Sequence, residues 1–359
     1  MEGRTYVIAE AGVNHDGSLE DALRLVDAAA DAGADCVKFQ TFRADALAAP
    51  SAEMAAYQKK GAHAGQTQRA MLERLELSHA AHVSLVERAT ARKIEFLSTP
   101  FDPPSLAFLT EVLGLKRIKV GSGDLTNAPL LLDIARAGRS VILSTGMATL
   151  SEVEEALSVL AFGYLRPQEL PSLTTFAAAW ADRRCREALN SRVVLLHCTS
   201  EYPTPPEAVN LRAIDTLASS FALPVGYSDH TLGIEAALGA VARGAVMIEK
   251  HLTLDRTRPG PDHAASLEPR QFASLVEGIR TLELALGDGR KVPHPVEAKN
   301  IAVARKAIVA ATPIAAGEKF SLSNLAAKRP GNGLAPIRIW ELIGRTAQRS
   351  YAADEAIEP

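Results

Sequence analysis

Short apolar runs of strand-forming residues alternate with longer amphipathic segments along the first 290 residues. Eight runs have the composition of buried strands: Tyr6–Ala11, Cys36–Gln40, Glu95–Ser98, Arg117–Val120, Ser140–Leu143, Val193–His197, Pro224–Tyr227 and Ala245–Ile248. Apolar residues at helical spacing follow most of them, for example in Leu19–Ala32, Leu106–Val112 and Ser151–Leu160. Eight strand-then-helix units in this length predict a closed (β/α)8 TIM barrel over residues 1–290.

An open, doubly wound sheet is the alternative arrangement of the same units. Its usual signature, G-x-G-x-x-G after the first strand, is missing from this sequence. The regular spacing breaks between residues 163 and 191, where Pro167, Pro171 and Trp180 occur. We expect this insert to be a partly helical elaboration after the fifth strand.

Polar residues collect where the predicted strands end, which is where such barrels carry their reactive groups. In chain order they are Glu10, Asn14, His15, Lys38, Gln40, Ser98, Thr99, Lys119, Ser122, Asp124, Ser144, Thr145, His197, Thr199, Ser200, Tyr202, Ser228, His230, Glu249 and His251. The pattern therefore predicts an active site at this end of the barrel.

Two histidines, His230 and His251, follow neighbouring predicted strands. Imidazoles fixed at adjacent strand ends can share one divalent metal. Histidines that only hydrogen-bond to the backbone are the alternative. The polar neighbours Ser228, Asp229 and Glu249 favour a metal site.

Lys38 and Lys119 lie within otherwise apolar runs, where an unpaired ammonium group would be costly to bury. An anion should therefore face them. Internal salt bridges to Glu10 or Glu249 would satisfy this requirement. The nearby hydroxyl groups and glycines favour a site for a phosphate or carboxylate ligand instead.

Composition restricts the partners and the compartment. The formal net charge is −3, 23% of residues are charged, and no basic block occurs, so we expect neither nucleic acid nor a membrane as a partner. No apolar run reaches membrane-spanning length, and the first residues lack a signal-peptide pattern. Three widely spaced cysteines indicate a reducing cytoplasm.

Seven motifs resemble the sialic acid synthase family and occur in that family's order. They are IAEAGVNHDG at Ile8–Gly17, VKFQTF at Val37–Phe42, LSTPFD at Leu97–Asp102, LSTGMA at Leu143–Ala148, LLHCTSEYPTP at Leu195–Pro205, GYSDHTLG at Gly226–Gly233 and IEKHLTLD at Ile248–Asp255. The resemblance implies condensation of phosphoenolpyruvate with an N-acylated mannosamine-type sugar, giving a nine-carbon 2-keto sugar acid and phosphate.

The resemblance also implies a role for each matching position. His230 and His251 would hold a divalent metal, Mn²⁺ or Mg²⁺, and Glu10 would handle protons. The phosphoenolpyruvate-binding positions would be Lys38, Lys119, Ser122, Ser144 and Ser228. The sugar-binding positions would be Gln40, Thr99, Phe101, Asp124, Tyr202, Asp262 and Arg329.

Residues 300–359 follow a proline-bearing linker at 291–299 and have the pattern of short strands and turns. This tail resembles the antifreeze-like (SAF) domain that closes these synthases. The resemblance implies a domain-swapped homodimer in which Arg329 of the motif KRPGNG contacts the N-acyl group of the sugar bound to the partner's barrel. Without the resemblance, Arg329 would be a surface residue in a turn.

Three departures from the family pattern concern the sugar. Asp124 replaces the usual Glu, Ser200 replaces the Asn of some members, and the 163–191 insert is longer than usual. The opening AEAGVNH and the later GYSDHT resemble the neuraminate and legionaminate branches more than the pseudaminate branch. A pseudaminate synthase, a Schiff-base aldolase using Lys119 or Lys38, and a non-catalytic carbohydrate-binding protein are the alternatives.

Overall fold

The computed structural model describes residues 3–54, 67–329 and 333–358. The chain forms two compact units that divide after Gly287. The first contains the eight-stranded sheet, and the second contains a two-stranded sheet.

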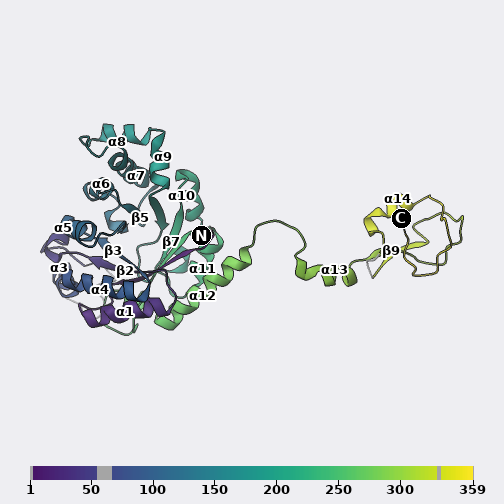
Figure 1. Cartoon of the computed structure of the whole chain (residues 1–359), viewed down its shortest axis with the longest axis horizontal. Helices are drawn as coiled ribbons and strands as arrows, with labels where there is room; N and C mark the ends of the chain where they lie inside the picture. The colour runs from purple at the N-terminus through teal and green to yellow at the C-terminus, as the bar shows by residue number, and fades with distance from the viewer. Residues whose placement is uncertain (1–2, 55–66, 330–332, 359) are drawn as a thin grey trace. The chain divides into compact units, whose positions relative to one another are not determined.

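Eight parallel strands form the centre of the first unit (Figure 1). They are β1 Tyr6–Gly12, β2 Cys36–Thr41, β3 Glu95–Pro100, β4 Arg117–Val120, β5 Ser140–Ser144, β6 Val193–His197, β7 Val225–Asp229 and β8 Met247–His251. The order in the sheet is β3-β2-β1-β8-β7-β6-β5-β4, and the end strands β3 and β4 pack side by side. The sheet therefore curls into a barrel, which confirms the predicted fold class and excludes the open sheet.

Helices surround these strands (Figure 1). They are α1 Leu19–Asp31, α2 Ala44–Leu47, α3 Gln68–Leu75, α4 His79–Arg92, α5 Pro103–Ala107, α6 Ala128–Arg136, α7 Leu150–Leu165, α8 Leu173–Trp180, α9 Arg184–Asn190, α10 Ala213–Phe221, α11 Glu235–Ala242 and α12 Pro269–Leu286. Within the described residues, none of the helices has the length and apolar character needed to span a membrane.

The segment predicted as one helix at Leu106–Val112 has a different structure. Helix α5 already begins at Pro103, because Asp102 caps it by accepting a hydrogen bond from the Ser105 amide at 2.7 Å. Residues Phe108–Val112 then form a π-helical turn. The periodic apolar residues predicted helical structure in the correct region, but they did not reveal the Asp102 cap that sets where α5 begins.

The last two strands were also predicted to end too early. Ser228 lies inside β7, and Glu249 and His251 lie inside β8 rather than after it. The register explains the difference, because Glu10 of β1 is opposite His251 of β8 and the ladder continues through these polar residues. Charged residues interrupt an apolar run here without ending the strand.

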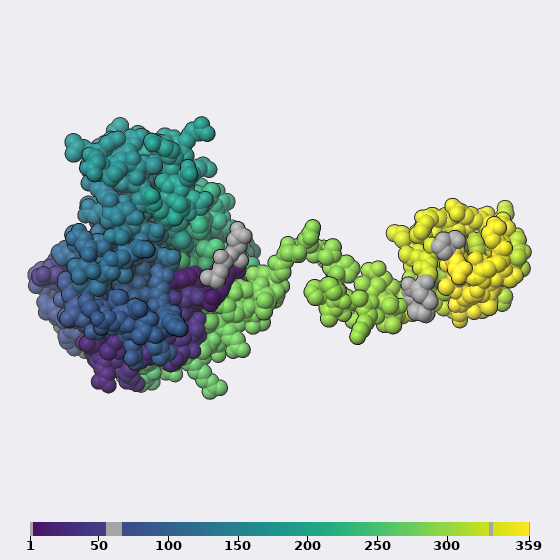
Figure 2. Space-filling model, in the orientation of Figure 1, coloured from purple at the N-terminus to yellow at the C-terminus, as the bar shows by residue number. Residues whose placement is uncertain are grey.

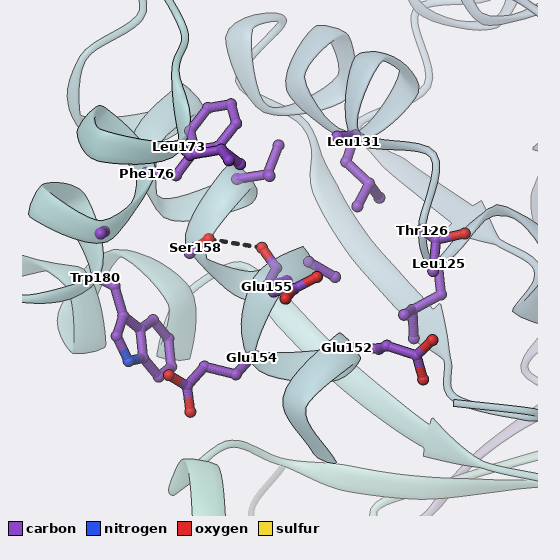
Figure 3. A pocket seen from close by; sticks show the side chains of 14 residues that line it. Leu125, Thr126, Leu131, Glu152, Glu154, Glu155, Ser158, Leu173, Phe176 and Trp180 are labelled. Atoms are coloured by element: carbon purple, nitrogen blue, oxygen red, sulfur yellow. Dashed lines mark hydrogen bonds between the residues drawn. The ribbon is translucent and has the colours of Figure 1, made fainter. Parts of the chain in front are cut away.

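The 163–191 insert is helical, as expected, and packs on the outside of the barrel. Helices α8 and α9 both pack on α7, with Phe176 edge-on to Phe162 at 5.2 Å between ring centroids. The insert forms a projecting part of the first unit (teal in Figure 2). A pocket of about 410 Å³ lies between α6, α7 and α8, and its lining includes Glu154 and Trp180 (Figure 3).

The second unit is small and rich in β-structure. Strand β9 Ala307–Ala310 pairs antiparallel with β10 Leu325–Lys328, and a separate apolar cluster that includes Ile308, Phe320 and Tyr351 forms its core. Helix α13 Ala298–Ala304 precedes β9, and α14 Ile339–Leu342 follows β10. Residues 330–332 of the KRPGNG motif lie outside the described residues.

The barrel interior is filled in layers by side chains that alternate along each strand. One layer is apolar and contains Ile8, Cys36, Leu97, Ile142, Leu196 and Met247. Gly226 completes this layer because a Cβ there would lie 2.5 Å from the Met247 carbonyl oxygen and 2.6 Å from Leu196 Cδ2. Two residues further along the same strands, the interior becomes polar.

We expect Gly226→Ala to destabilise the barrel because the new methyl group would meet backbone atoms that cannot move away. The free energy of unfolding should fall by about 1–3 kcal/mol, the usual range for overpacking. Gly123→Ala is the control, since its Cβ would meet nothing within 4 Å in the described part of the chain. Urea unfolding of both variants measures the difference, and equal stability would contradict the packing argument.

Candidate active site

Four ionisable side chains share the interior layer above the apolar one. Glu10 comes from β1, Lys38 from β2, Lys119 from β4 and Glu249 from β8, and all four are buried. Lys38 Nζ lies 2.7 Å from Glu10 Oε2 and 3.6 Å from Glu249 Oε2. Lys119 Nζ lies 3.8 Å from Glu249 Oε1. Internal carboxylates therefore do face both lysines, as in the salt-bridge interpretation.

Burial and mutual attraction shift the pKa values of this layer in different directions. Burial raises the pKa of Glu10 to about 7, although Lys38 opposes the shift. Burial also opposes ionisation of Glu249, but Lys119 and Lys38 hold its pKa at about 2. Burial lowers the pKa of Lys119. Glu10 is therefore the carboxyl group of this layer that can exchange a proton near neutral pH.

Hydroxyl groups complete the layer. Lys119 donates to Ser144 Oγ at 2.7 Å, and Ser228 Oγ donates to Glu249 Oε1 at 2.8 Å. The structure thus brings together four of the five positions assigned to phosphoenolpyruvate. The fifth, Ser122, lies further out, where its Oγ accepts from the Gly146 amide at 3.0 Å and contacts Cys198 Sγ at 3.2 Å.

The two histidines predicted to bind metal lie close together above this layer. The ring centroids of His230 and His251 are 5.6 Å apart, and the Tyr202 ring lies 4.2 Å from the first and 5.7 Å from the second. His230 Nδ1 donates to the Thr199 carbonyl oxygen at 2.7 Å, which leaves Nε2 with its lone pair. Burial lowers the pKa of both imidazoles, so both are neutral at pH 7.

The donor atoms present at this position fit a divalent ion. The buried Nδ1 of His251 has no hydrogen-bond partner among the described residues, and Asp262 Oδ2 lies 3.9 Å away. Neutral imidazoles are common ligands of divalent transition metals. No group of three or more His, Cys, Asp or Glu side chains forms a metal site within the described ranges. Any ion held by this pair would therefore need further ligands from substrate or water.

The predicted sugar-binding residues are only partly grouped. Gln40 donates to Glu10 Oε1 at 3.4 Å, and Thr99 Oγ1 accepts from Lys38 at 3.4 Å, so both border the charged layer. Asp262 lies beside His251, and burial raises its pKa to about 6. Asp124 is bound by the Asn127 side chain at 2.9 Å.

The remaining two predicted positions belong to different units of the chain. Phe101 of the first unit packs against Phe42 with ring centroids 6.3 Å apart. Arg329 belongs to the second unit, where its Nε donates to the Ala304 carbonyl oxygen at 2.7 Å.

Two residues of the site were not among the predicted ligand-binding positions. Glu249 contacts both lysines, as the salt-bridge alternative anticipated, although no ligand-binding role was assigned to it. Asn14 ties the β1–α1 loop to the segment after β8, because Nδ2 donates to the Leu252 carbonyl oxygen at 2.9 Å and to Ser266 Oγ at 2.8 Å. No local sequence pattern indicates this long-range contact.

Comparison with protein-family models identifies both parts of the chain. The model described as the NeuB family matches residues 25–291, and the model described as the SAF domain matches residues 305–359. The chain therefore belongs to the NeuB, or sialic acid synthase, family and is an enzyme, which confirms the resemblance. Membership of this enzyme family also excludes the alternative of a non-catalytic carbohydrate-binding protein.

Curated relatives align over nearly the whole chain. The N,N'-diacetyllegionaminic acid synthase of Campylobacter jejuni is 46% identical over 355 residues, covering 99% of this chain and 99% of the relative. That of Legionella pneumophila is 44% identical over 97% of this chain and 92% of the relative. The solved N-acetylneuraminic acid synthetase of Leptospira borgpetersenii is 36% identical, with a TM-score of 0.66 over 83% of this chain and 90% of that one.

Proposed function

We propose that this enzyme condenses phosphoenolpyruvate with 2,4-diacetamido-2,4,6-trideoxymannose to form N,N'-diacetyllegionaminic acid and phosphate. The buried layer of Glu10, Lys38, Lys119 and Glu249 beneath two neutral imidazoles carries the proposal. This layer contains two lysines that can bind an anionic substrate, and it contains Glu10, a carboxyl group that can exchange a proton near neutral pH. The two relatives above 40% identity are named legionaminic acid synthases, which supports this sugar over N-acetylmannosamine.

The side chains of the layer supply what phosphoenolpyruvate needs. Lys38 and Lys119 offset its negative charge, and Ser144, whose Oγ accepts from Lys119, can donate its hydroxyl proton. Ser228 can do the same once its proton turns away from Glu249. The enol C3 attacks the sugar aldehyde carbon and forms the new C–C bond, which leaves C2 electron-poor. Water then adds to C2, and the resulting intermediate releases phosphate when the C2–O bond to the phosphoryl group breaks.

Glu10 can balance the protons of these steps. Because its pKa is about 7, a large fraction carries a proton at neutral pH and can donate it to the aldehyde oxygen as the C–C bond forms. The carboxylate produced can then take the proton from the water that attacks C2. One side chain thus serves as acid first and as base second.

His230 and His251 are the residues that would hold Mn²⁺ or Mg²⁺. Such an ion would polarise the aldehyde oxygen of the open-chain sugar. The neutral state of both rings and the unpaired Nδ1 of His251 support this assignment.

The cysteines Cys36, Cys185 and Cys198 are free, which supports the proposed cytoplasmic location.

A Schiff-base aldolase is the second candidate, because burial lowers the pKa of Lys119 and so favours the nucleophilic amine. Its Nζ, however, donates hydrogen bonds to Ser144 Oγ and to the Val120 carbonyl oxygen. In this arrangement the amine is a hydrogen-bond donor, which fits an anion-binding role better than a nucleophilic one. A pseudaminate synthase remains an alternative for the sugar.

A substrate panel tests the proposed reaction. Phosphate release from phosphoenolpyruvate should be at least tenfold faster with 2,4-diacetamido-2,4,6-trideoxymannose than with N-acetylmannosamine or the pseudaminate precursor. EDTA should abolish the reaction, and Mn²⁺ should restore it. Faster release with another sugar would change the substrate, activity retained in EDTA would remove the metal, and a borohydride-trapped adduct on Lys119 would favour the aldolase.

Binding of phosphoenolpyruvate should depend on the protonation of Glu10. Its raised pKa means that the neutral form predominates below about pH 7, and this form does not compete for Lys38. The dissociation constant should therefore rise with pH above 7, by up to tenfold per unit. Calorimetry from pH 6 to 8.5 on wild type and on Glu10→Gln, which is neutral throughout, measures this effect. The proton linkage is wrong if both proteins show the same pH dependence.

Arg329 should act across a dimer if the tail domain is swapped. Arg329→Ala and His230→Ala should each be nearly inactive, whereas a mixture that exchanges subunits should regain up to about a quarter of wild-type activity, since one composite site in a heterodimer is intact. Exposed Arg305→Ala in place of Arg329→Ala is the control for the tail. Demonstrated exchange without recovery would show that Arg329 acts within its own chain or has no catalytic role.

A further inference from the structure

A second buried ion pair lies on the opposite face of the strands that carry the two histidines. Asp229 of β7 and Lys250 of β8 are register partners, and both side chains are 0% exposed. Side chains alternate along a strand, so Lys250 faces the helices while its neighbours Glu249 and His251 face the barrel interior. Lys250 Nζ lies 2.7 Å from Asp229 Oδ2.

This pair fixes the residue that follows His230. Asp229 Oδ1 accepts from the Thr231 amide at 2.9 Å and from Thr231 Oγ1 at 2.8 Å. Lys250 Nζ donates to the Thr231 carbonyl oxygen at 2.6 Å. The backbone amide, the carbonyl oxygen and the side chain of Thr231 are thus all held by two charged groups, and Tyr227 adds a fourth donor to Asp229 at 3.2 Å.

His230 lies between these fixed points and is itself held on the other side. The Thr204 amide donates to the His230 carbonyl oxygen at 2.9 Å, and His230 Nδ1 donates to the Thr199 carbonyl oxygen at 2.7 Å. The ring can make the second bond only when its backbone is held at one position, because the acceptor belongs to a different loop. The orientation of Nε2 toward the site therefore depends on Asp229 and Thr231.

Stability alone is a poor explanation for this pair. Removing two charges from water is costly, and apolar residues of similar volume in such positions often give equal or greater stability. The other outward-facing positions of the same strands, such as Val225 and Ile248, are apolar. The pair instead supplies directed bonds to a single residue, which apolar packing could not do.

We propose that the Asp229–Lys250 ion pair is a positioning device that holds His230 Nε2 toward the reacting groups. The inference rests on the proposed function, in which His230 acts at the aldehyde end of the substrate. Asp229 and Lys250 lie on the face of the strands away from the barrel interior, so they are positioning residues and act through Thr231 and the backbone of His230.

Two charge-free double variants test the proposal without leaving one charge unpaired. Asp229→Asn with Lys250→Met retains a possible acceptor for Thr231, whereas Asp229→Leu with Lys250→Met removes it. Val225→Ala, a cavity variant on the same face of β7, is the control for lost stability. The first readout is solvent exchange of the His230 Nδ1 proton in ¹⁵N-histidine-labelled protein in EDTA, assigned by its absence in His230→Ala.

Exchange should become at least tenfold faster in the Asn variant and faster still in the Leu variant, but should change less than twofold in Val225→Ala. Mn²⁺ affinity, measured from the electron paramagnetic resonance signal of free Mn²⁺, should fall at least tenfold in both double variants, while KM for phosphoenolpyruvate stays within about twofold. Unchanged exchange in folded double variants would overturn the proposal. If wild type and His251→Ala both fail to bind Mn²⁺, the metal part of the proposed function fails, and proton exchange alone decides the positioning role.

Discussion

The interior of the barrel removes four ionisable side chains from water, and the rest of the site depends on how they pair. Glu10, Lys38, Lys119 and Glu249 are two carboxyl groups and two amines joined at ion-pair distances, and the raised pKa of Glu10 leaves it partly protonated at neutral pH. A single buried charge without a partner would be severely destabilising, so each of the four requires the others. Their positions on β1, β2, β4 and β8 mean that the whole circle of strands must close before this balance is reached.

The apolar layer beneath these groups makes their interaction strong. This layer packs across the barrel interior, and the missing side chain of Gly226 leaves space for it. Its members are Ile8, Cys36, Leu97, Ile142, Leu196 and Met247. Water is excluded from that side, which lowers the local dielectric and strengthens attraction between the charges above. The same exclusion raises the pKa of Glu10, so packing in one layer sets the proton chemistry of the next.

The sequence was sufficient to predict the barrel, the insert and which polar side chains lie together inside it, because strand alternation and the motifs are both visible in short stretches of chain. Lys119 contacts Ser144, and Lys38 and Lys119 both lie against Glu249, as the strand-end pattern indicated. The ends of β7 and β8 were misjudged, since charged residues there pair with one another across strands instead of meeting solvent. The contact of Asn14 with Ser266 joins residues 252 positions apart and has no local signature. The sequence also could not predict whether carboxylates of the chain or a ligand would face Lys38 and Lys119, because that depends on the distances between side chains of different strands.

Strand β8 explains why the site needs a charge cluster on each side of the sheet. Its consecutive residues Glu249, Lys250 and His251 alternate between the barrel interior and the helical layer. Glu249 bonds Ser228 inside the barrel, and Lys250 bonds Asp229 outside it, so β7 and β8 are joined through side chains on both faces. The backbone ladders to β1 and β7 already fix the orientation of β8 about its axis. The side-chain bonds on both faces add to these ladders, and the relative placement of His230 and His251 follows from the ladders and the two clusters acting together.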